Sequence, residues 1–541
     1  MNASFSDHRV AAVPRLRGSP RWRAAASAGL LAAACLCGAG ARADEEPPGR
    51  IARAAEVSGD VRTVDAQGEW VTLPRNQPLS TGDRVITGKE GRATIEIGSS
   101  TVRIGPVSDL SIRRLDDQKI FLHFSHGQMA LRARSADILG ELAVDTDEGV
   151  WVPRHPGHFR FDRAPRQVLA VQAWSGDLLL EAPDSSLPVG ANQRAEVWRE
   201  GPRAATHSKM VAPMVDDFAN WALARNGVDD RDASVVAAAL AQGVPLEMTG
   251  ASDLVRYGQW SDAPGFGSVW MPDAVPSGWA PYQDGFWTWI APWGWTWVDD
   301  SPWGFAPFHY GRWVPLHGRW AWTPGHWSGR PVYAPALVGW LGGAGFALDG
   351  APAIGWVALA PDELFFPGYA VSSRYWSIVN NGRTPPARRL PESLKGRTRF
   401  VPAGPVAYAN VGAPDAVAVI ATASLLPRAP VGAMRSDRRR SPPGAMMAKA
   451  AELPPPGPPA GRAALAAAAE VVPVSRAGAP ASAGVPAIAP PSMRTTPISA
   501  PASTMALRKP APPAVPVPPS ATSGAQRLSA DRYDADLRER R

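Results

Sequence analysis

Tryptophan is concentrated in one short stretch of this chain. Of the 22 tryptophans in 541 residues, 13 lie between Trp260 and Trp327. They alternate with Gly, Pro and Thr in runs such as 292–297, Pro-Trp-Gly-Trp-Thr-Trp. Alternate residues of a β-strand point to one face, so such a run places its rings together, and frequent Gly and Pro end each strand early. The stretch therefore predicts a small antiparallel β domain of hairpins, with the Trp runs at 287–289 and 320–322 extending one face.

Two interpretations of these rings remain open. A buried aromatic side chain covers about 150–250 Å², so a few Trp could form the core of a domain that is short of Leu and Ile. Large apolar patches that stay exposed usually mark interaction sites, so part of the set could instead bind a glycan, peptidoglycan or a protein partner. The candidate platform residues are Tyr282, Trp287, Trp289, Trp293, Trp295, Trp297, Trp303, Tyr310, Trp313, Trp320 and Trp322.

Polar residues in the same stretch give little support for catalysis. Asp299 and Asp300 are adjacent, so in a strand or a turn they do not flank one glycosidic bond. His309, His317 and His326 have neither the helical spacing nor the Cys neighbours of a zinc site. We therefore expect a non-enzymatic protein with no catalytic residues, cofactor or metal, and a glycan-active enzyme is the disfavoured alternative.

The first 43 residues have the form of an export signal. Arg21 and Arg23 precede an Ala-rich apolar stretch at 24–40, and the small residues around it predict cleavage between Ala43 and Asp44. This stretch is short for a membrane span, which needs about 20 strongly apolar residues, although an uncleaved anchor is an alternative. We expect a periplasmic or secreted protein.

Both cysteines, Cys35 and Cys37, lie inside this signal. A weak lipobox ends at Cys35, so lipidation there is a variant of the same export route. Cleavage after Ala43 would leave a mature chain with no thiol and hence no disulfide, and no later segment is apolar for long enough to span a membrane.

The net charge of +7 does not indicate a nucleic-acid partner. Residues 1–43 contribute +5 and residues 436–541 contribute +7, which leaves the body at about −5. A nucleic-acid-binding domain would show a basic stripe on a folded face, and none is visible in the sequence.

Residues 51–200 show the pattern of short β-strands. Polar and apolar residues alternate at 93–97 and 101–104, which is typical of half-buried strands. Glycines at 127, 157, 176 and 190 are spaced as turns would be, so we predict an all-β sandwich or β-roll. Further strands are expected near 121–124, 142–144, 159–161, 168–174 and 178–180.

The run Thr-Gly-Asp-Arg-Val-Ile-Thr-Gly at 81–88, with Gly127 and the segment 171–176, resembles the FecR-like periplasmic domain over roughly 51–195. The resemblance implies an all-β module of a family whose members pass a signal from an outer-membrane receptor to a sigma factor. Such transducers need a cytoplasmic domain ahead of a membrane span. Only about 23 residues precede the apolar stretch here, too few for a folded domain. A sensor or regulator without its own transmembrane transducer is therefore the alternative function.

A change of periodicity at 213–243 predicts a helical connector. Phe218 and Trp221 lie one turn apart in a short amphipathic helix, where we expect them to pack in the core, and Asn226-Gly227 is the predicted stop. Ser234 can cap a second helix at 235–241.

The run from Trp279 to Trp322 resembles a Trp-rich domain of unknown function that follows FecR-like domains in exported proteobacterial proteins. The resemblance continues upstream through the run Asp-Leu-Val-Arg-Tyr-Gly-Gln-Trp at 253–260 and downstream through Trp356 and Asn410. We assign residues 250–432 to this domain. The family has no established activity, so the resemblance implies which family the segment belongs to but does not imply a function.

Residues 436–541 are rich in Pro and Ala, with runs such as Pro-Pro-Pro-Gly-Pro-Pro at 454–459. Such a segment cannot bury enough apolar surface to offset the entropy of ordering, so we expect a disordered, basic tail. Taken together, the sequence predicts a mainly β, exported protein that binds or scaffolds an envelope glycan or a protein partner through its Trp-rich domain. It does not indicate the oligomeric state.

Overall fold

The computed structural model describes residues 46–64, 68–164, 168–201, 205–231, 243–327, 329–343, 345–384, 398–402, 406–425 and 430–431. The predicted signal with Cys35, Ala43 and Asp44, the second predicted helix at 235–241, and the predicted tail at 436–541 lie outside these residues. The described chain is mainly β, as the sequence predicts.

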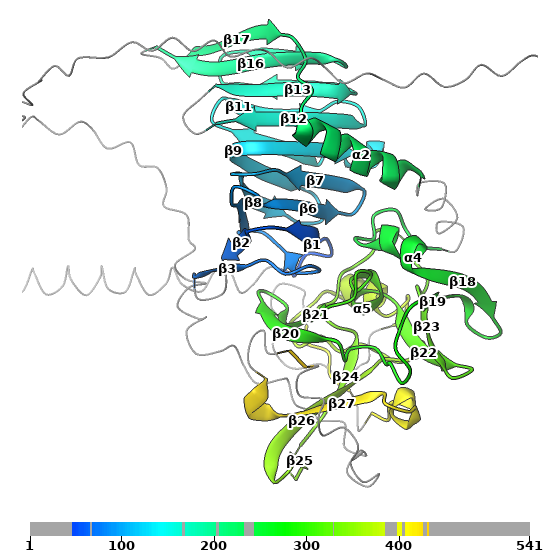
Figure 1. Cartoon of the computed structure of the whole chain (residues 1–541). Helices are drawn as coiled ribbons and strands as arrows, with labels where there is room; N and C mark the ends of the chain where they lie inside the picture. Colours follow the sequence, from blue (N-terminus) through cyan, green and yellow to red (C-terminus); the bar gives the residue numbers. More distant parts are fainter. Residues whose placement is uncertain are drawn as a thin grey trace, which may run out of the picture. The chain divides into compact units, whose positions relative to one another are not determined.

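Strands fill the first half of the described chain, which we call the N-terminal β module (Figure 1). Its elements are β1 (Ala52–Ser58), β2 (Val61–Val64), β3 (Trp70–Thr72), β4 (Pro78–Leu79), β5 (Arg84–Thr87), β6 (Arg92–Ile97), β7 (Ser100–Ile104), β8 (Asp109–Leu115), β9 (Ile120–Ala133), the 3-10 helix η1 (Ala136–Ile138), β10 (Leu142–Thr146), β11 (Gly149–Pro153), β12 (Gly157–Arg163), β13 (Leu169–Ser175), β14 (Leu178–Glu181), β15 (Ser186–Val189), β16 (Gln193–Glu200) and β17 (Ala205–Val211).

The long strand β9 divides these strands into two layers. Its first half, up to His126, pairs with β8 and, in parallel, with β10. Its second half, from Gly127, pairs with β7 and β12. Gly127 has φ 103°, and a Cβ there would clash with the backbone of Ser108, so this position requires glycine. The first layer, which contains the second half of β9, runs β4-β1-β6-β7-β9-β12-β13-β16-β17. The second layer, which contains the first half of β9, runs β3-β2-β5-β8-β9-β10-β11-β14-β15.

The core of this module lies between the two layers. One cluster of buried side chains joins residues of both, for example Val102 and Phe159 of the first layer with Leu122 and Trp151 of the second. Of the two folds that the alternating pattern predicts, a sandwich and a β-roll, this two-layer arrangement is the sandwich.

Helix α2 (Asp217–Arg231) follows the last strand and lies across the outer face of the first layer (Figure 1). Phe218 is buried against Ala130, Ala222, Trp174 and Trp221, which confirms the predicted packing of the two aromatic residues.

The predicted stop at Asn226-Gly227 is wrong, because the helix continues to Arg231. Asn226 is buried and its side chain accepts a hydrogen bond of 2.6 Å from Arg103. This tertiary contact holds the residue inside the helix and overrides its local preference as a terminator.

The second half, from Ala251 to Ser424, we call the Trp-rich module. Its elements are α4 (Ala251–Tyr257), β18 (Gly258–Ala263), β19 (Gly267–Pro272), β20 (Gly285–Ile290), β21 (Gly294–Asp299), α5 (Ala306–His309), β22 (Arg312–Leu316), β23 (Arg319–Thr323), β24 (Val338–Leu341), β25 (Ala347–Leu348), β26 (Ala351–Ala358), α6 (Ser373–Val379), the 3-10 helix η2 (Ala409–Gly412), β27 (Val417–Ala421) and the 3-10 helix η3 (Thr422–Ser424).

The strands of this module form three small antiparallel sheets and not the one sheet expected. They are the hairpin β20-β21, the sheet β18-β19-β23-β22, and a sheet in which β26 pairs with β24, β25 and β27. The Trp320 and Trp322 strand therefore does not extend the face of β21, because β23 pairs with β19 at Trp270 instead. A single aromatic cluster still joins residues from all three sheets.

Candidate functional site

Pairs of tryptophans face each other across the hairpins of the Trp-rich module. Trp287 lies opposite Trp297, and Trp289 lies opposite Trp295, in β20-β21. The same relation recurs in the other two sheets, at Trp260 and Trp270, Trp313 and Trp322, and Trp340 and Trp356. Cross-strand aromatic pairs stabilise antiparallel sheets, so each hairpin brings its own stabilising pair to the common core.

The rings meet mostly edge to face. The Trp287 and Trp297 centroids lie 5.4 Å apart at 68°, and the Trp287 and Trp356 centroids lie 5.3 Å apart at 83°. Several indole N–H groups also donate to main-chain oxygens: Trp313 to Pro307 at 2.9 Å, and Trp322 to Tyr310 at 2.8 Å. Edge-to-face contacts and satisfied N–H groups are typical of aromatic residues in a specified core.

The structure corrects the exposed-platform interpretation. Ten of the eleven candidate residues are at most 7% exposed, and Trp289 alone is partly exposed. The reason is that three sheets and the α5 turn close around the rings, so that rings which share a strand face point inward. Their burial agrees with the other interpretation, in which the tryptophans form the core of the domain. The ten buried residues are Tyr282, Trp287, Trp293, Trp295, Trp297, Trp303, Tyr310, Trp313, Trp320 and Trp322.

The two adjacent carboxylates have different surroundings. Asp300 is exposed, whereas Asp299 is buried and accepts hydrogen bonds from the Ser301 N–H at 2.9 Å and the Trp297 indole at 3.0 Å. Burial raises the pKa of Asp299 to about 8, although these hydrogen bonds oppose the rise. Asp299 therefore holds together the turn that follows β21.

The three histidines of the segment differ in burial. His309 is fully buried, its Nδ1 lies 2.8 Å from the Ala334 carbonyl, and burial lowers its pKa to about 3. His317 and His326 are exposed. Among the described residues, no group of three or more His, Cys, Asp or Glu side chains is placed to hold a metal ion.

A buried ion-pair cluster, which we call the Arg53 junction, connects the N-terminal β module to the Trp-rich module. Arg53 of β1 donates to Glu96 of β6 at 2.9 Å and to Asp253 of α4 at 2.5 Å. Its guanidinium also lies 5.6 Å from the centroid of the Phe305 ring. Burial raises the pKa of Asp253 to about 6, and the charge of Arg53 opposes that rise.

Asn76 completes the Arg53 junction. Its side-chain oxygen accepts from Arg53 at 3.2 Å, and its amide donates to the carbonyls of Asp299 at 2.9 Å and Ser301 at 2.7 Å. Ile51 also belongs to the aromatic cluster of the Trp-rich module. Strand β1 and the turn before β4 thus contribute to both cores, which makes one continuous packed unit of the two modules.

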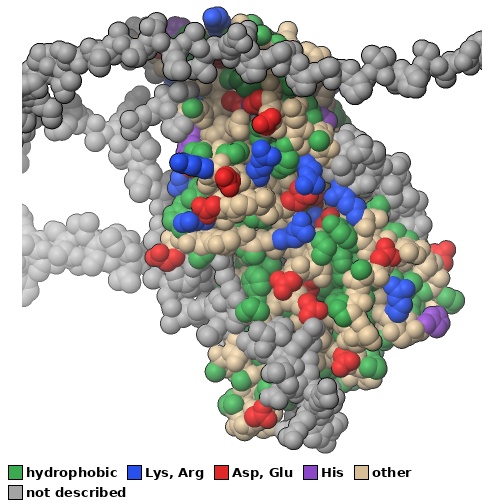
Figure 2. Space-filling view, viewed as in Figure 1, with side chains coloured by type: hydrophobic (Ala, Val, Ile, Leu, Met, Phe, Trp, Pro, Cys, Tyr) green, Lys and Arg blue, Asp and Glu red, His purple; other side chains and the backbone are tan. Residues whose placement is uncertain are grey.

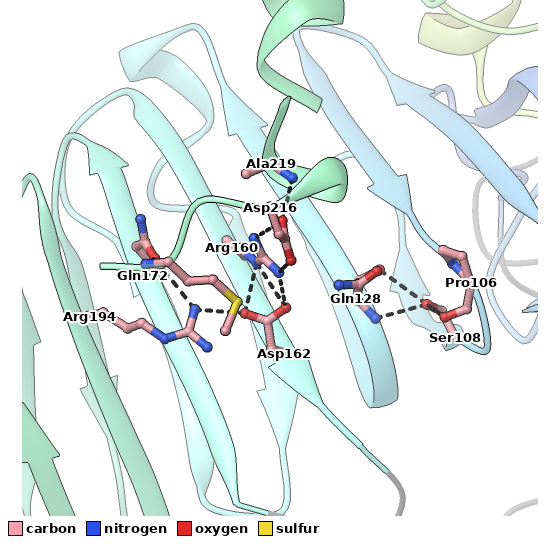
Figure 3. Close-up of polar contacts among 10 residues, drawn as sticks. Pro106, Ser108, Gln128, Arg160, Asp162, Gln172, Arg194, Asp216 and Ala219 are labelled. Carbon is pink, nitrogen blue, oxygen red and sulfur yellow. Dashed lines mark hydrogen bonds and ion pairs between the residues drawn. The ribbon is translucent and has the colours of Figure 1, made fainter. Parts of the chain in front are cut away.

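A polar row on the outer face of the first layer was not recognised from the sequence (Figure 3). Cross-strand partners place its members side by side on consecutive strands, with Gln172 between Arg160 and Arg194. Polar positions in an alternating strand predict exposure, but here the chain that follows β17 covers them. The row consists of Thr94, Arg103, Arg160, Gln172 and Arg194, and the apolar Ala130 lies between Arg103 and Arg160.

Asp216 ties the helix to this row. Arg160, which is fully buried, donates to Asp216 at 2.6 and 2.7 Å and to Asp162 at 2.8 Å (Figure 3). Asp216 also accepts from the Ala219 N–H at 2.8 Å, as an N-cap residue does. The hydrogen bonds from Arg160 lower the pKa of Asp216. The feature of the sequence that could have indicated this contact is an Asp two residues before the aromatic Phe218.

The surface seen in Figure 2 carries basic and acidic side chains interspersed over the N-terminal β module. This face therefore does not present the uniformly positive electrostatic field that binds nucleic acid. In the part of the chain that the structure describes, no helix has both the length and the apolar character needed to cross a membrane.

Comparison with known proteins assigns part of the chain. Residues 251–363 match a family model described as a family of unknown function, DUF6600. This match falls inside the predicted Trp-rich domain and confirms that the segment is a domain of unknown function. No curated protein matches the chain.

Two crystal structures of a provisionally named anti-sigma factor from Parabacteroides distasonis ATCC 8503 show a weak similarity. They are 12% and 11% identical to this chain, with a TM-score of 0.21 in both cases. Each match covers 24% of this chain and 60% of the other. Similarity at this level carries no argument about fold or function, so the FecR-like assignment stays a prediction.

Proposed function

We propose that the protein is a non-enzymatic scaffold of the bacterial cell envelope that binds a protein partner. The observation that supports this proposal is the continuous packing of the two modules through the Arg53 junction. A buried ion-pair network with its hydrogen bonds satisfied can specify one arrangement of the elements that it joins. Two modules held in one arrangement present their outer strands at fixed positions, which is what a scaffold requires.

The burial of the tryptophans favours a protein partner over a glycan. Stacking on sugar rings needs aromatic faces that are open to solvent, and Trp289 is the one candidate platform residue with a partly exposed ring. Asp299 and His309 are enclosed in the core by their hydrogen bonds, an arrangement that serves the fold and not a reaction at a surface. A regulator of the FecR-like kind would also act by binding proteins.

The test is an envelope-fractionation experiment on the full chain with its natural leader. We expect a mature N-terminus at Asp44 by mass spectrometry and recovery of the protein in the periplasmic or secreted fraction. In-cell crosslinking should yield a defined complex with another protein, while purified peptidoglycan sacculi should not sediment the chain. Sedimentation with sacculi, release of sugar fragments, or retention in the cytoplasm would contradict the proposal.

A further inference from the structure

Strand β17 ends the first layer of the N-terminal β module with an edge that is regular and exposed. All seven of its residues pair with β16 without a bulge. Ser208, Lys209 and Met210 are exposed. Proteins usually blunt such an edge with bulges, prolines or charges, because unpaired main-chain groups can template another strand. Of these devices the strand has the charge of Lys209 alone.

The direction of the free main-chain groups follows from Thr206. Its N–H donates to the Asp184 side chain at 2.8 Å, and so points away from β16. In an antiparallel strand, the N–H and C=O of one residue point to the same side, and alternate residues point to opposite sides. Ser208 and Met210 therefore direct their N–H and C=O groups outward, and among the described residues no main-chain partner meets them.

The accessible length is short and well defined. Asp184 occupies the edge at Thr206, and Pro213, which has no N–H, follows the strand. After Pro213 the chain turns back over the layer, where the Met214 N–H donates to Gln172 at 2.8 Å. A segment of about five residues can pair with this edge, given the two outward-facing residues and their neighbours.

The two faces of β17 differ in chemistry. Met210 pairs with Ala195, whose side chain is in the core, so Met210 lies on the inner face, and it is 48% exposed there. His207 and Lys209 lie on the outer face, where the His207 ring stacks on Trp198 at 5.7 Å. Methionine adapts its shape to different apolar partners. On the outer face Lys209 lies opposite Glu196 of β16, and an acidic side chain on an added strand would meet Lys209 from its other side.

We propose that the free edge of β17 binds an extended segment of a partner protein as an added strand. The segment places an apolar side chain beside Met210 and an acidic side chain beside Lys209. This inference rests on the proposed function and names the surface through which the scaffold would bind. Main-chain hydrogen bonds supply affinity in this mode of recognition, and the alternate side chains supply specificity.

A second copy of this chain fits the edge less well. Antiparallel self-pairing centred on Lys209 sets two lysines directly opposite each other, which destabilises a sheet. Pairing over about five residues also buries much less than the roughly 1,200–2,000 Å² of a stable protein interface. A flexible peptide segment does not need that area.

The test uses the full chain and a labelled peptide of about nine alternating Val and Glu residues, with both ends capped. Ser208→Pro removes the outward N–H of residue 208 and spares the hydrogen bonds to β16, because residue 208 does not donate to β16; edge strands tolerate proline in this orientation. Ser208→Ala is the matched control. A peptide that is N-methylated at alternate amides tests the same hydrogen bonds without any change to the protein.

We expect the peptide to bind the natural chain and Ser208→Ala equally, and to lose at least about tenfold in affinity with Ser208→Pro, since the variant loses a main-chain hydrogen bond and the proline ring adds a clash. The N-methylated peptide should bind as weakly. Equal binding to Ser208→Pro, or a dimer of the chain that Ser208→Pro abolishes, would overturn the proposal. If crosslinking yields an envelope partner but the peptide does not bind, the proposed strand addition at β17 is wrong and the proposed function stands. If neither a crosslinked partner nor peptide binding is found, the proposed function is wrong as well.

Discussion

Arg53 in β1 and Asp253 in α4 are 200 residues apart in the sequence and form a buried hydrogen bond of 2.5 Å. The guanidinium is 1% exposed and the carboxylate 9% exposed. Removal of one member of a buried pair leaves an uncompensated charge, which is costlier than the loss of an exposed pair. This contact gives the first prediction.

Arg53→Met should lower the free energy of unfolding by about 3–5 kcal/mol, because both Glu96 and Asp253 then lose their buried cation. The matched control is Arg62→Met, since Arg62 and its partner Asp60 are about half exposed and such pairs contribute about 0–1 kcal/mol. Urea unfolding followed by circular dichroism measures both variants. Equal effects would contradict the assignment of the junction.

Asp299 gives a prediction about pH. Its pKa is raised from 3.8 to about 8 by burial, so between these values the folded state holds a proton that the unfolded state has released. Stability contributed by this group is therefore full at low pH and falls as the pH rises through that window, by up to about 1.4 kcal/mol per pH unit.

Asp299→Asn should flatten this fall, at a constant cost of about 1 kcal/mol, because the amide nitrogen cannot accept one of the two hydrogen bonds. Urea midpoints measured between about pH 4 and about pH 8 give the slope. Asp262→Asn, which removes an exposed carboxylate of the same module, is the control. A slope that Asp299→Asn leaves unchanged would show that the side chain is ionised in the fold.

Trp297 tests the packing of the aromatic core. It is fully buried, faces Trp287 across the hairpin and contacts the Tyr282 ring. Trp297→Ala should destabilise the chain by about 3–5 kcal/mol. Phe266→Ala, in the turn between β18 and β19, removes a ring that is 36% exposed and should cost no more than about 0.5 kcal/mol. Thermal melts compare the two, and similar midpoints would argue against a tryptophan core.

Asp216 and Asp217 form a natural matched pair at the start of α2. Asp216 holds Arg160 and caps the helix, whereas the side chain of Asp217 is exposed. Asp216→Ala should speed hydrogen exchange in the first turns of α2 at least about tenfold, since a lost cap costs about 1 kcal/mol and the lost ion pair adds to it. Asp217→Ala should change the exchange rate little. If the two variants behave alike, the helix is held by Phe218 and not by the ion pair.

Much of the secondary structure could be predicted from local patterns. Alternation located several strands of the N-terminal β module, among them β6, β7 and β13, but not β15, β16 or β17, and the Trp runs located β20, β21 and β23. The pairing of Trp287 with Trp297 was also available, because the two residues are equidistant from Pro292 in the turn, as are Trp289 and Trp295. Trp260 and Trp270 are equidistant from Gly265 in the same way. A search for symmetric Trp spacing around turns would have found these pairs.

The contacts between distant segments could not be predicted in this way. The pairing of β23 with β19, the Arg53 junction and the burial of Arg160 by Asp216 join residues from about 50 to 200 positions apart. Local periodicity describes which face a side chain takes but not what covers that face. For this reason the ring-lined faces were predicted, whereas their enclosure by two further sheets and by α5 was not.

The burial of the tryptophans in one core is measured by how far the quencher acrylamide reaches tryptophan in the native full chain. Thirteen tryptophans are buried in the described residues, most of them in one cluster. We expect a blue-shifted emission dominated by indoles that acrylamide reaches poorly, and a large gain in quenching after unfolding in urea. Strong quenching of most of the emission in the native chain, similar to that in urea, would contradict it.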